Sequence, residues 1–313
     1  MSDDKNAATT VAAALRELAA RLAEAGIEDP MVDAELLIGH VLGETRGRVQ
    51  ALAFMGGALD SGQFDALGEL ADERARRVPL QHLTGRAPFR AIDLSVGPGV
   101  FVPRPETETV VQIAIDALRA VPTPELIAID LCTGSGAIAL SLAHEVPTAR
   151  VFAVEKSVEA HAWAERNVAE WGDGRVELLL GDVAELDTSA RAVAARGAAG
   201  RGGLAAALEG LEGRVQVLVS NPPYVPSGMV PRDPEVRDHD PELALYSGED
   251  GLELIRTISR IGRRFLVPGA PIVLEHAEHQ GEAIRGILAR DGWSAPATHP
   301  DLTGRDRATT AIA

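Results

Sequence analysis

The spacing of hydrophobic positions changes twice along this chain. From residue 9 to about residue 77 the apolar side chains recur three or four positions apart, as at Val11, Leu15 and Leu18. This spacing places them on one face of a helix, and no run of strand-forming residues interrupts it. Residues 1–77 are therefore predicted to form a small helical-bundle domain.

The pattern then becomes extended. Residues 78–105 consist of short pieces broken by glycine and proline, and Ile92, Leu94 and Val96 alternate with polar residues as in a strand. This segment is predicted to be a β-hairpin linker between two domains.

From residue 106 to residue 313, short apolar runs alternate with helical patterns. Repeated strand–helix units predict an α/β, Rossmann-like domain in which helices cover both faces of a mainly parallel sheet. The apolar runs expected to form its strands are Leu126–Ile129, Val151–Val154, Val176–Leu180, Val215–Ser220 and Pro271–Leu274.

One stretch of this domain departs from the alternation. Residues 187–214 are rich in alanine, glycine, arginine and leucine, and they are predicted to be an insertion. It would form a mobile loop or a short amphipathic helix that carries Leu204, Leu208 and Leu211. A surface excursion without function is the favoured interpretation.

Composition narrows the classes of protein. At 313 residues, of which 46% are hydrophobic and 24% charged, the chain is long enough for two domains and a sizeable core. The formal net charge of −16 disfavours a nucleic-acid binder, which needs basic surface to neutralise phosphate. It fits a basic protein partner, or serves solubility alone.

The chain shows no sign of a membrane or secreted protein. It has no run of about 18 apolar residues, and Met1–Lys5 lacks the pattern of a secretory signal. Cys132 is the only cysteine, which excludes an internal disulfide and fits a reducing cytoplasm.

A glycine turn, Asp130–Gly136, separates a predicted strand from a predicted helix. Gly134 and Gly136 let the backbone turn sharply and approach a ligand. Glu155 ends the next strand, close to the position where nucleotide-binding folds carry an acid for the ribose hydroxyls. Because Ala139 replaces the third glycine of the dinucleotide fingerprint, an adenosine ligand without a pyrophosphate fits better than a dinucleotide.

A second motif, Asn221-Pro222-Pro223-Tyr224, follows a predicted strand at its carboxyl end, where open α/β sheets bind ligands. An amide or aromatic amine nitrogen is a poor nucleophile because its lone pair is delocalised. The side-chain carbonyl of Asn221 and the backbone carbonyl of Pro222 can accept its two hydrogens, and Tyr224 can stack on the planar group. The loop therefore predicts N-methylation with Asn221 and Pro222 as catalytic residues, whereas its alternative is a plain turn that ends a strand.

Other polar residues give weaker signals. Asp182 follows a predicted strand, where it would hold an adenine amino group or cap a helix. His276 and His279 share a helix-like stretch with two glutamates, but a third convergent ligand is missing and no metal is expected.

Taken together, these motifs resemble those of the release-factor glutamine methyltransferase family (the HemK/PrmC type) over nearly the whole chain. The Asn-Pro-Pro-Tyr loop alone is shared with adenine-N6 methyltransferases of nucleic acids, whereas the combination is more specific. The matching segments are residues 79–85, 101–108, 133–136, 221–224, 274–276 and 301–307.

The resemblance implies a class I methyltransferase that uses S-adenosylmethionine. It would methylate the side-chain N5 of the glutamine in the Gly-Gly-Gln motif of class I peptide chain release factors. Its helical domain would help to hold the factor, without stable binding of nucleic acid or membrane, and residues 221–224 would hold the glutamine amide. The residues assigned to the cofactor are Phe101, Arg104, Thr107, Cys132, Thr133, Gly134, Ser135, Gly136, Glu155, Asp182, Val183 and Asn221.

Three positions depart from the family pattern. Cys132 stands where glycine is frequent, and because cysteine avoids positive φ, a right-handed or extended conformation is expected there. Val183 stands where an aromatic residue often flanks adenine, so that stacking would be lost. Glu155 replaces a more usual aspartate, and its longer arm still reaches a ribose.

Two alternatives remain open from the sequence. One is a methyltransferase for another planar nitrogen, either a ribosomal-protein glutamine or adenine N6 of RNA or DNA. The acidic charge counts against nucleic acid, and the stretch Arg104–Glu108 favours release factors over ribosomal proteins. The other is a non-catalytic, cofactor-binding module of the ribosome, against which the intact loop 221–224 counts.

Overall fold

The computed structural model describes residues 9–188 and 203–313, which divide into two compact units. The helical unit holds the described residues up to Arg86 together with Pro231–His239. The sheet unit holds the described residues of Ala87–Val230 and of Asp240–Ala313. The helical unit extends to Arg86, beyond the boundary predicted after residue 77. The reason is that helix α5 (Leu80–Thr84) packs on other helices of this unit.

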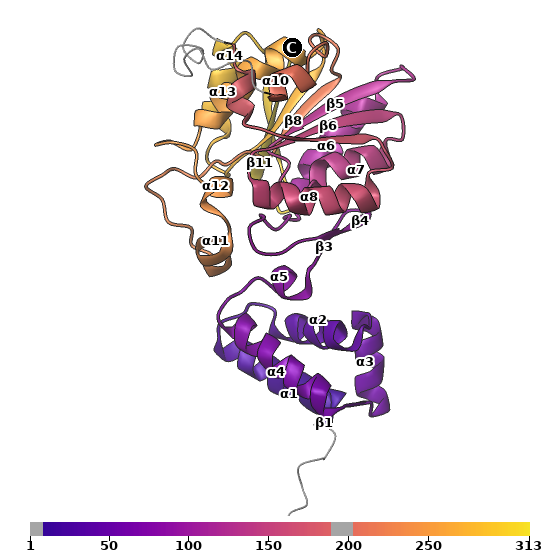
Figure 1. Ribbon diagram of the computed structural model, residues 1–313. Coiled ribbons are helices and arrows are strands. Elements are labelled where there is room, and N and C mark those ends of the chain that lie inside the picture. The colour runs from indigo at the N-terminus through magenta and orange to yellow at the C-terminus, as the bar shows by residue number, and fades with distance from the viewer. Residues whose placement is uncertain (1–8, 189–202) are drawn as a thin grey trace, which may run out of the picture. The chain divides into compact units, whose positions relative to one another are not determined.

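The helical unit is a small bundle, as its apolar spacing predicts (Figure 1). Its other helices are α1 (Val11–Glu24), α2 (Pro30–Leu42), α3 (Arg46–Met55), α4 (Ser61–Ala75) and α11 (Pro234–His239). Two features had no visible signal in the sequence. Helix α3 buries only Val49, so it shows no apolar face. A two-residue ladder between β1 (Thr9–Thr10) and β2 (Ala58–Leu59) also interrupts a stretch that was predicted to lack strands.

A buried ion cluster ties the segment Pro231–His239 to this bundle. Arg74 donates to Asp33 at 2.6 Å and to Glu235 at 2.9 Å, and its side chain is only 9% exposed. Arg77 donates to the other carboxylate oxygen of Glu235 at 2.6 Å and to the carbonyl of Gly26. A run of arginines at the end of a helix is usually solvated, but Arg74 and Arg77 are instead held in this cluster.

The sheet unit is built on seven strands. Five are parallel, and β10 and β11 join one edge antiparallel in the order β10-β11-β9-β8-β5-β6-β7. The strands are β5 (Leu126–Leu131), β6 (Ala149–Glu155), β7 (Val176–Leu180), β8 (Val217–Ser220), β9 (Pro271–Glu275), β10 (Ser294–Pro300) and β11 (Asp306–Ile312).

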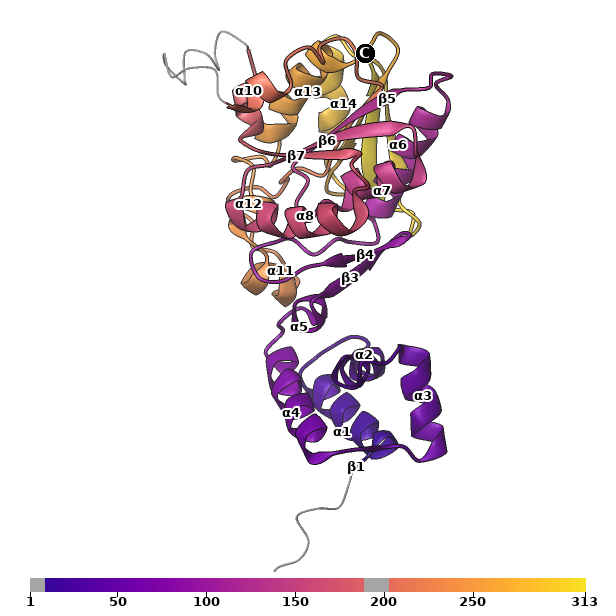
Figure 2. The ribbon, with the colours of Figure 1, turned by 45° about the vertical axis from the view of Figure 1, so that its right-hand side comes forward.

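Helices cover both faces of this sheet, which confirms the predicted α/β architecture (Figures 1 and 2). Alternate strand residues enter opposite cores: Ala128 packs with one set of helices and Ile129 with the other. One face carries α6 (Thr107–Arg119), α7 (Ala137–Glu145) and α8 (Val158–Trp171), and the other carries α10 (Gly203–Ala207), α13 (Glu253–Phe265) and α14 (Gly281–Arg290).

The predicted hairpin is part of the sheet unit. Its strands β3 (Arg86–Phe89) and β4 (Ile92–Ser95) pack their apolar side chains into the core beside α8. The indole nitrogens of Trp163 and Trp171 donate to the carbonyls of Pro98 and Asp93 at 3.1 and 3.2 Å. Helix α8 therefore fastens the hairpin to this unit.

The predicted insertion contains residues 189–202, which lie outside the described part of the chain. Its residues Leu204, Leu208 and Leu211 are buried in the core that also contains Val183 and Leu186. The expectation of a surface excursion is therefore wrong for these three leucines, and the short helix α10 matches the amphipathic alternative.

Across residues 9–188 and 203–313, no helix is both long enough and apolar enough to cross a membrane.

The ion cluster generates a stability prediction. Glu235→Gln leaves Arg74 and Arg77 buried with one negative partner fewer, so the free energy of unfolding should fall by about 3 kcal/mol at pH 7. Urea denaturation measures this change. The matched control is Glu73→Gln, which removes an exposed ion pair to Arg76 and should cost no more than about 0.5 kcal/mol. Equal effects of the two variants would contradict a structural role for the cluster.

The same cluster predicts a pH dependence. Burial raises the pKa of Glu235, but hydrogen bonds within the cluster outweigh it and set the pKa at about 2, below the ordinary 4.5. A carboxyl with a depressed pKa stabilises the fold above its unfolded-state pKa and loses that contribution as the pH falls through the folded-state value. The stability difference between wild type and Glu235→Gln should therefore shrink between pH 4.5 and pH 2.

Candidate active site

The strand register brings the predicted site residues to one edge of the sheet. Leu131 pairs with Ser220, Ser220 with Leu274, and Leu131 with Val154. The next residue of each strand therefore stands at the same level. Those residues are Cys132 of the glycine turn, Asn221, Glu275 and Glu155, at the carboxyl edge where open α/β sheets bind ligands.

Asp130, near the end of β5, stabilises the glycine turn by accepting two hydrogen bonds. Its Oδ2 accepts from the Thr133 hydroxyl at 2.5 Å and from the backbone N–H of Ala139 at 3.1 Å. The carboxyl is fully buried, and this burial raises its pKa to about 7 despite the two hydrogen bonds. Asp130 therefore fixes the turn and does not face solvent.

Glu155 stabilises the same turn at Gly134. Its Oε2 accepts from the backbone N–H of Gly134 at 2.8 Å, and its Oε1 accepts from those of Lys156 and Ser157 at 2.9 and 2.7 Å. Burial raises its pKa above the usual value although all three N–H groups oppose the shift. The side chain of Glu155, which is predicted to bind the ribose hydroxyls, is thus held in place by three backbone N–H groups.

Cys132 adopts a conformation that was not expected. Its φ is +65°, in the left-handed region that favours glycine, whereas the sequence analysis predicts a right-handed or extended residue. The turn needs this angle between the end of β5 and Gly134, so the cysteine accepts the strain. Burial raises the pKa of its thiol, which keeps Cys132 protonated.

Asn167 supports the turn and was missed in the sequence. This fully buried side chain donates to the carbonyls of Ser135 and Ser95 at 2.9 and 3.0 Å and accepts from the N–H of Ser95 at 2.7 Å. It lies on α8, where a single asparagine carries no signal that distinguishes it from a surface residue.

Asp182 stands at the neighbouring strand end. Its Oδ1 caps the short helix Val183–Leu186 by accepting from the N–H of Ala184, and its Oδ2 pairs with Lys156 at 2.8 Å. The helix-cap alternative for Asp182 is therefore present, and its side chain remains 35% exposed. Val183 is buried and does not project as a stacking surface.

The loop Asn221–Tyr224 is held from two sides. Gln280 donates to the carbonyl of Tyr224 at 2.9 Å, and the N–H of Val225 donates to the carbonyl of Leu245 at 2.7 Å. Gly251 lies so close that a Cβ there would stand 2.2 Å from the Tyr224 carbonyl oxygen. Burial raises the pKa of the Tyr224 hydroxyl, and the charge of Glu275 adds to this shift.

Phe101, Arg104 and Thr107, which are assigned to the methionine end of the cofactor, make two separate sets of contacts. The Arg104 guanidinium stacks over the Phe101 ring at 5.2 Å and pairs with Asp240 at 3.1 Å. The Thr107 hydroxyl instead accepts from Nδ2 of Asn221 at 3.4 Å. Thr107 is thus beside Asn221, the residue that the sequence predicts to be catalytic.

Glu275 is the functional candidate that the sequence analysis overlooked. It ends β9 and is 2% exposed, so it does not lie on the helix-like stretch that was predicted. The adjacent His276 is fully buried, bonds Thr309 at 2.8 Å and has a pKa lowered by desolvation, so it is a structural neutral imidazole. An acidic residue at the end of a strand that neighbours β8 would have indicated Glu275. The strand order is needed to recognise it, and the sequence does not give that order.

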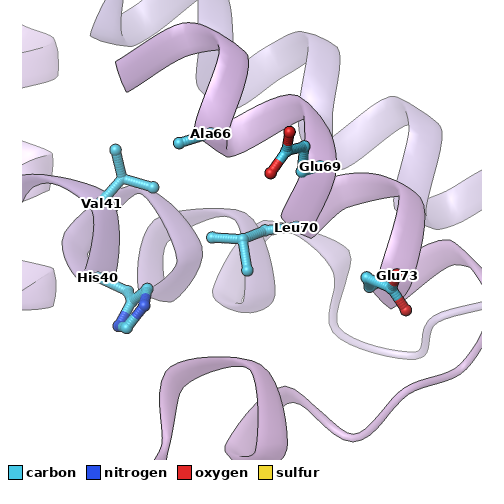
Figure 3. Close-up of a pocket in the computed structure, with 6 residues that line it drawn as sticks. All are labelled: His40, Val41, Ala66, Glu69, Leu70 and Glu73. Carbon is cyan, nitrogen blue, oxygen red and sulfur yellow. The ribbon is translucent and has the colours of Figure 1, made fainter. Parts of the chain in front are cut away.

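The helical unit has a hollow between α2 and α4 (Figure 3). It is lined from α2 and α4, and none of the predicted site residues belongs to it. Its lining residues are His40, Val41, Ala66, Glu69, Leu70 and Glu73.

The geometry at the sheet edge fits S-adenosylmethionine. A Cβ at Gly134 would meet nothing within 4 Å, so space is open over the turn. The acids Glu155 and Asp182 lie at the ends of neighbouring strands at that edge, and acidic groups there suit a cationic ligand without phosphate. A Rossmann-like sheet with this turn and an Asn-Pro-Pro-Tyr loop defines a class I, S-adenosylmethionine-dependent methyltransferase.

Comparisons with known proteins specify the family. A model of the PrmC N-terminal domain matches residues 13–85, and a model described as a methyltransferase domain matches residues 128–209. The release factor glutamine methyltransferase of Streptomyces coelicolor is 47% identical over 294 residues, covering 93% of this chain and 94% of its own length. Those of Bifidobacterium longum and Mycolicibacterium smegmatis are 40% and 41% identical, each over at least 95% of this chain and 98% of their own. The chain belongs to the release factor glutamine methyltransferase family.

The strain at Cys132 gives a stability prediction. Glycine tolerates a φ of +65° and alanine does not, so Cys132→Gly should be more stable than Cys132→Ala by about 1 kcal/mol. Both variants lose the thiol packing, which makes alanine the matched control. Thermal denaturation at neutral pH compares them. An alanine variant as stable as the glycine variant would show that the turn relaxes.

The close approach at Gly251 gives an activity prediction. Gly251→Ala should push the Tyr224 carbonyl aside and reduce methyl transfer about 100-fold, because displacements near 1 Å cost that much. Single-turnover transfer from labelled cofactor measures it. Gly269→Ala is the control, since Gly269 also has a positive φ but a Cβ there meets nothing within 4 Å. Similar losses in both variants would assign the effect to backbone strain alone.

Proposed function

We propose that this protein transfers the methyl group of S-adenosylmethionine to the side-chain N5 of the glutamine in the Gly-Gly-Gln motif of class I peptide chain release factors. The observation that carries the proposal is the loop Asn221–Tyr224, held rigid at the carboxyl edge of the sheet beside the glycine turn. The similar proteins of Streptomyces coelicolor and Bifidobacterium longum are release factor glutamine methyltransferases, which agrees with a release factor as the methyl acceptor.

The chemistry assigns a role to each part of the loop. The glutamine amide nitrogen is a weak nucleophile, so it must be oriented with its lone pair toward the methyl carbon. Oδ1 of Asn221 and the carbonyl of Pro222 accept its two hydrogens, Pro223 stiffens the loop, and Tyr224 covers the planar group. Such positioning supplies about 7–11 kcal/mol in well-oriented reactions, so a separate strong base is not required.

The glycine turn would hold the cofactor. S-adenosylmethionine would supply the electrophilic methyl group: as the bond to N5 forms, the methyl–sulfur bond breaks, S-adenosylhomocysteine is left, and the amide nitrogen releases one proton to solvent. Residues 132–136 would contact the cofactor through the backbone, Glu155 would receive the ribose hydroxyls on its remaining lone pairs, and Asp182 with Val183 would border the adenine. Phe101, Arg104 and Thr107 border the methionine end.

The helical unit is proposed to help hold the release factor, and the reaction to take place in the cytoplasm. The net charge of −16 favours encounter with a basic surface of the factor. No stable complex with nucleic acid is proposed, because a net charge of −16 disfavours the phosphate neutralisation that such a complex needs.

A methyl-acceptor assay tests the proposal. Purified protein, labelled S-adenosylmethionine and a class I release factor should give label on the Gly-Gly-Gln glutamine alone. A factor with that glutamine changed to alanine is the control and should remain unlabelled. Label on tRNA, rRNA or DNA in place of the factor would overturn the proposed substrate.

Asn221→Ala tests the grip on the amide. Transfer should fall at least about 100-fold, the usual cost of removing one oriented hydrogen-bond partner from a transition state. Calorimetric titration should show that S-adenosylmethionine still binds. Turnover near the wild-type rate would remove Asn221 from the mechanism.

A further inference from the structure

Glu275 is placed directly against Asn221. Ser220 pairs with Leu274 in the parallel register of β8 and β9, so the residues that follow them, Asn221 and Glu275, are neighbours on adjacent strands. Glu275 is 2% exposed and Thr107 is 3% exposed, so water does not compete for their hydrogen bonds. Within residues 9–188 and 203–313, Oε2 of Glu275 has no hydrogen-bond partner.

The three side chains form a directed network. Nδ2 of Asn221 donates to the Thr107 hydroxyl at 3.4 Å, and the side chains of Thr107 and Asn221, as hydrogen-bond donors, both lower the pKa of the Glu275 carboxyl. A hydroxyl can donate or accept, so Thr107 alone would allow either orientation of the asparagine amide. An ionised carboxylate only accepts. It therefore takes the hydroxyl hydrogen of Thr107 and one hydrogen of Nδ2, and the second Nδ2 hydrogen goes to the hydroxyl lone pair.

This arrangement uses both hydrogens of Nδ2 and leaves Oδ1 without a partner in the network. We propose that Glu275 is a positioning residue that orients the Asn221 amide so that Oδ1 faces the substrate nitrogen. The inference rests on the proposed role of Asn221 as the acceptor of a substrate N–H. Glu275 itself does not touch the substrate.

Protonation of Glu275 would undo this orientation. The carboxyl then carries an O–H that can donate to Oδ1 of Asn221. The amide of Asn221 then turns Nδ2 toward the substrate, so that two N–H donors, that of Asn221 and that of the substrate amide, face each other. Desolvation raises the pKa of Glu275 to about 7, the Thr107 hydrogen bond and Arg307 lower it, and Glu106 raises it. The remaining groups that face Glu275 are Tyr224 and Asn221.

The sign of the pH effect follows. Glu275 orients Asn221 only in its ionised form. The rate of methyl transfer is therefore highest above this pKa and decreases as the pH falls through it. In Thr107→Val the carboxylate loses a hydrogen bond that favours ionisation, so the loss should begin at higher pH.

The experiment measures kcat and KM for a release factor, with labelled S-adenosylmethionine at saturation, from about pH 9 to about pH 6. In Glu275→Gln, kcat at the upper end should fall about 10-fold or more, with KM and cofactor affinity within about twofold of wild type and the acid limb absent. In Thr107→Val the limb should move to higher pH. Glu145→Gln is the matched control: it removes a partly buried carboxylate that pairs with Arg90 at 2.5 Å in the same unit, and it should keep the wild-type profile.

The outcomes separate the two proposals. If Asn221→Ala retains transfer, the proposed function itself fails. If Asn221→Ala is inactive while Glu275→Gln keeps the wild-type kcat and acid limb, the positioning role of Glu275 alone is overturned. Should Glu275→Gln fail to fold, Thr107→Val decides, since a limb at the wild-type pH in that variant also overturns the inference.

Discussion

The site depends on the register of the parallel strands. Leu131, Ser220 and Leu274 stand at one level in β5, β8 and β9, and the Ser220 hydroxyl donates to the Leu131 carbonyl at 2.6 Å. A slip of one residue would exchange the faces of a strand and bury its other set of side chains. The full burial of Ile129 and Leu218 on one face, and of Ala128 and Val219 on the other, opposes that slip. The two cores therefore specify where the chemistry stands.

Buried acids accompany this register. Asp130, Glu155 and Glu275 are each less than 9% exposed, and burial of a carboxylate is costly unless hydrogen bonds compensate. Thr133 and Ala139 supply the hydrogen bonds of Asp130, and three backbone N–H groups supply those of Glu155, so the cost of burial is offset by bonds that also shape the glycine turn. The partners of Glu275 are instead the side chains of Thr107 and Asn221, and Asn221 belongs to the loop 221–224. This difference is the physical reason to assign Glu275 a role beyond folding.

The sequence predicted the parts of the site whose chemistry is local. Glycines at 134 and 136 and the loop 221–224 lie within short motifs, and the strand–helix alternation predicted the edge at which they meet. The sequence could not predict what depends on strand order or on distant partners. Asn167 bonds residues of a hairpin and a turn far from it in the chain, and Glu275 becomes informative only once β9 is known to lie beside β8. The φ of Cys132 was predicted wrongly because local preference was given priority over the geometry of the turn.

Specificity has to come from outside the loop that performs the chemistry. A carbonyl pair that accepts two hydrogens from a planar nitrogen suits an adenine amine as well as a glutamine amide, so residues 221–224 alone do not choose between them. The segment that follows them in the chain, Pro231–His239, belongs to the helical unit, where Glu235 is held by two arginines at 2.9 and 2.6 Å. An ion cluster of this kind adds little net stability compared with apolar packing, but it is strongly disfavoured when one member is displaced. It therefore fixes Pro231–His239 within the helical unit, so a segment that follows the loop 221–224 in the chain belongs to the unit that is proposed to hold the release factor.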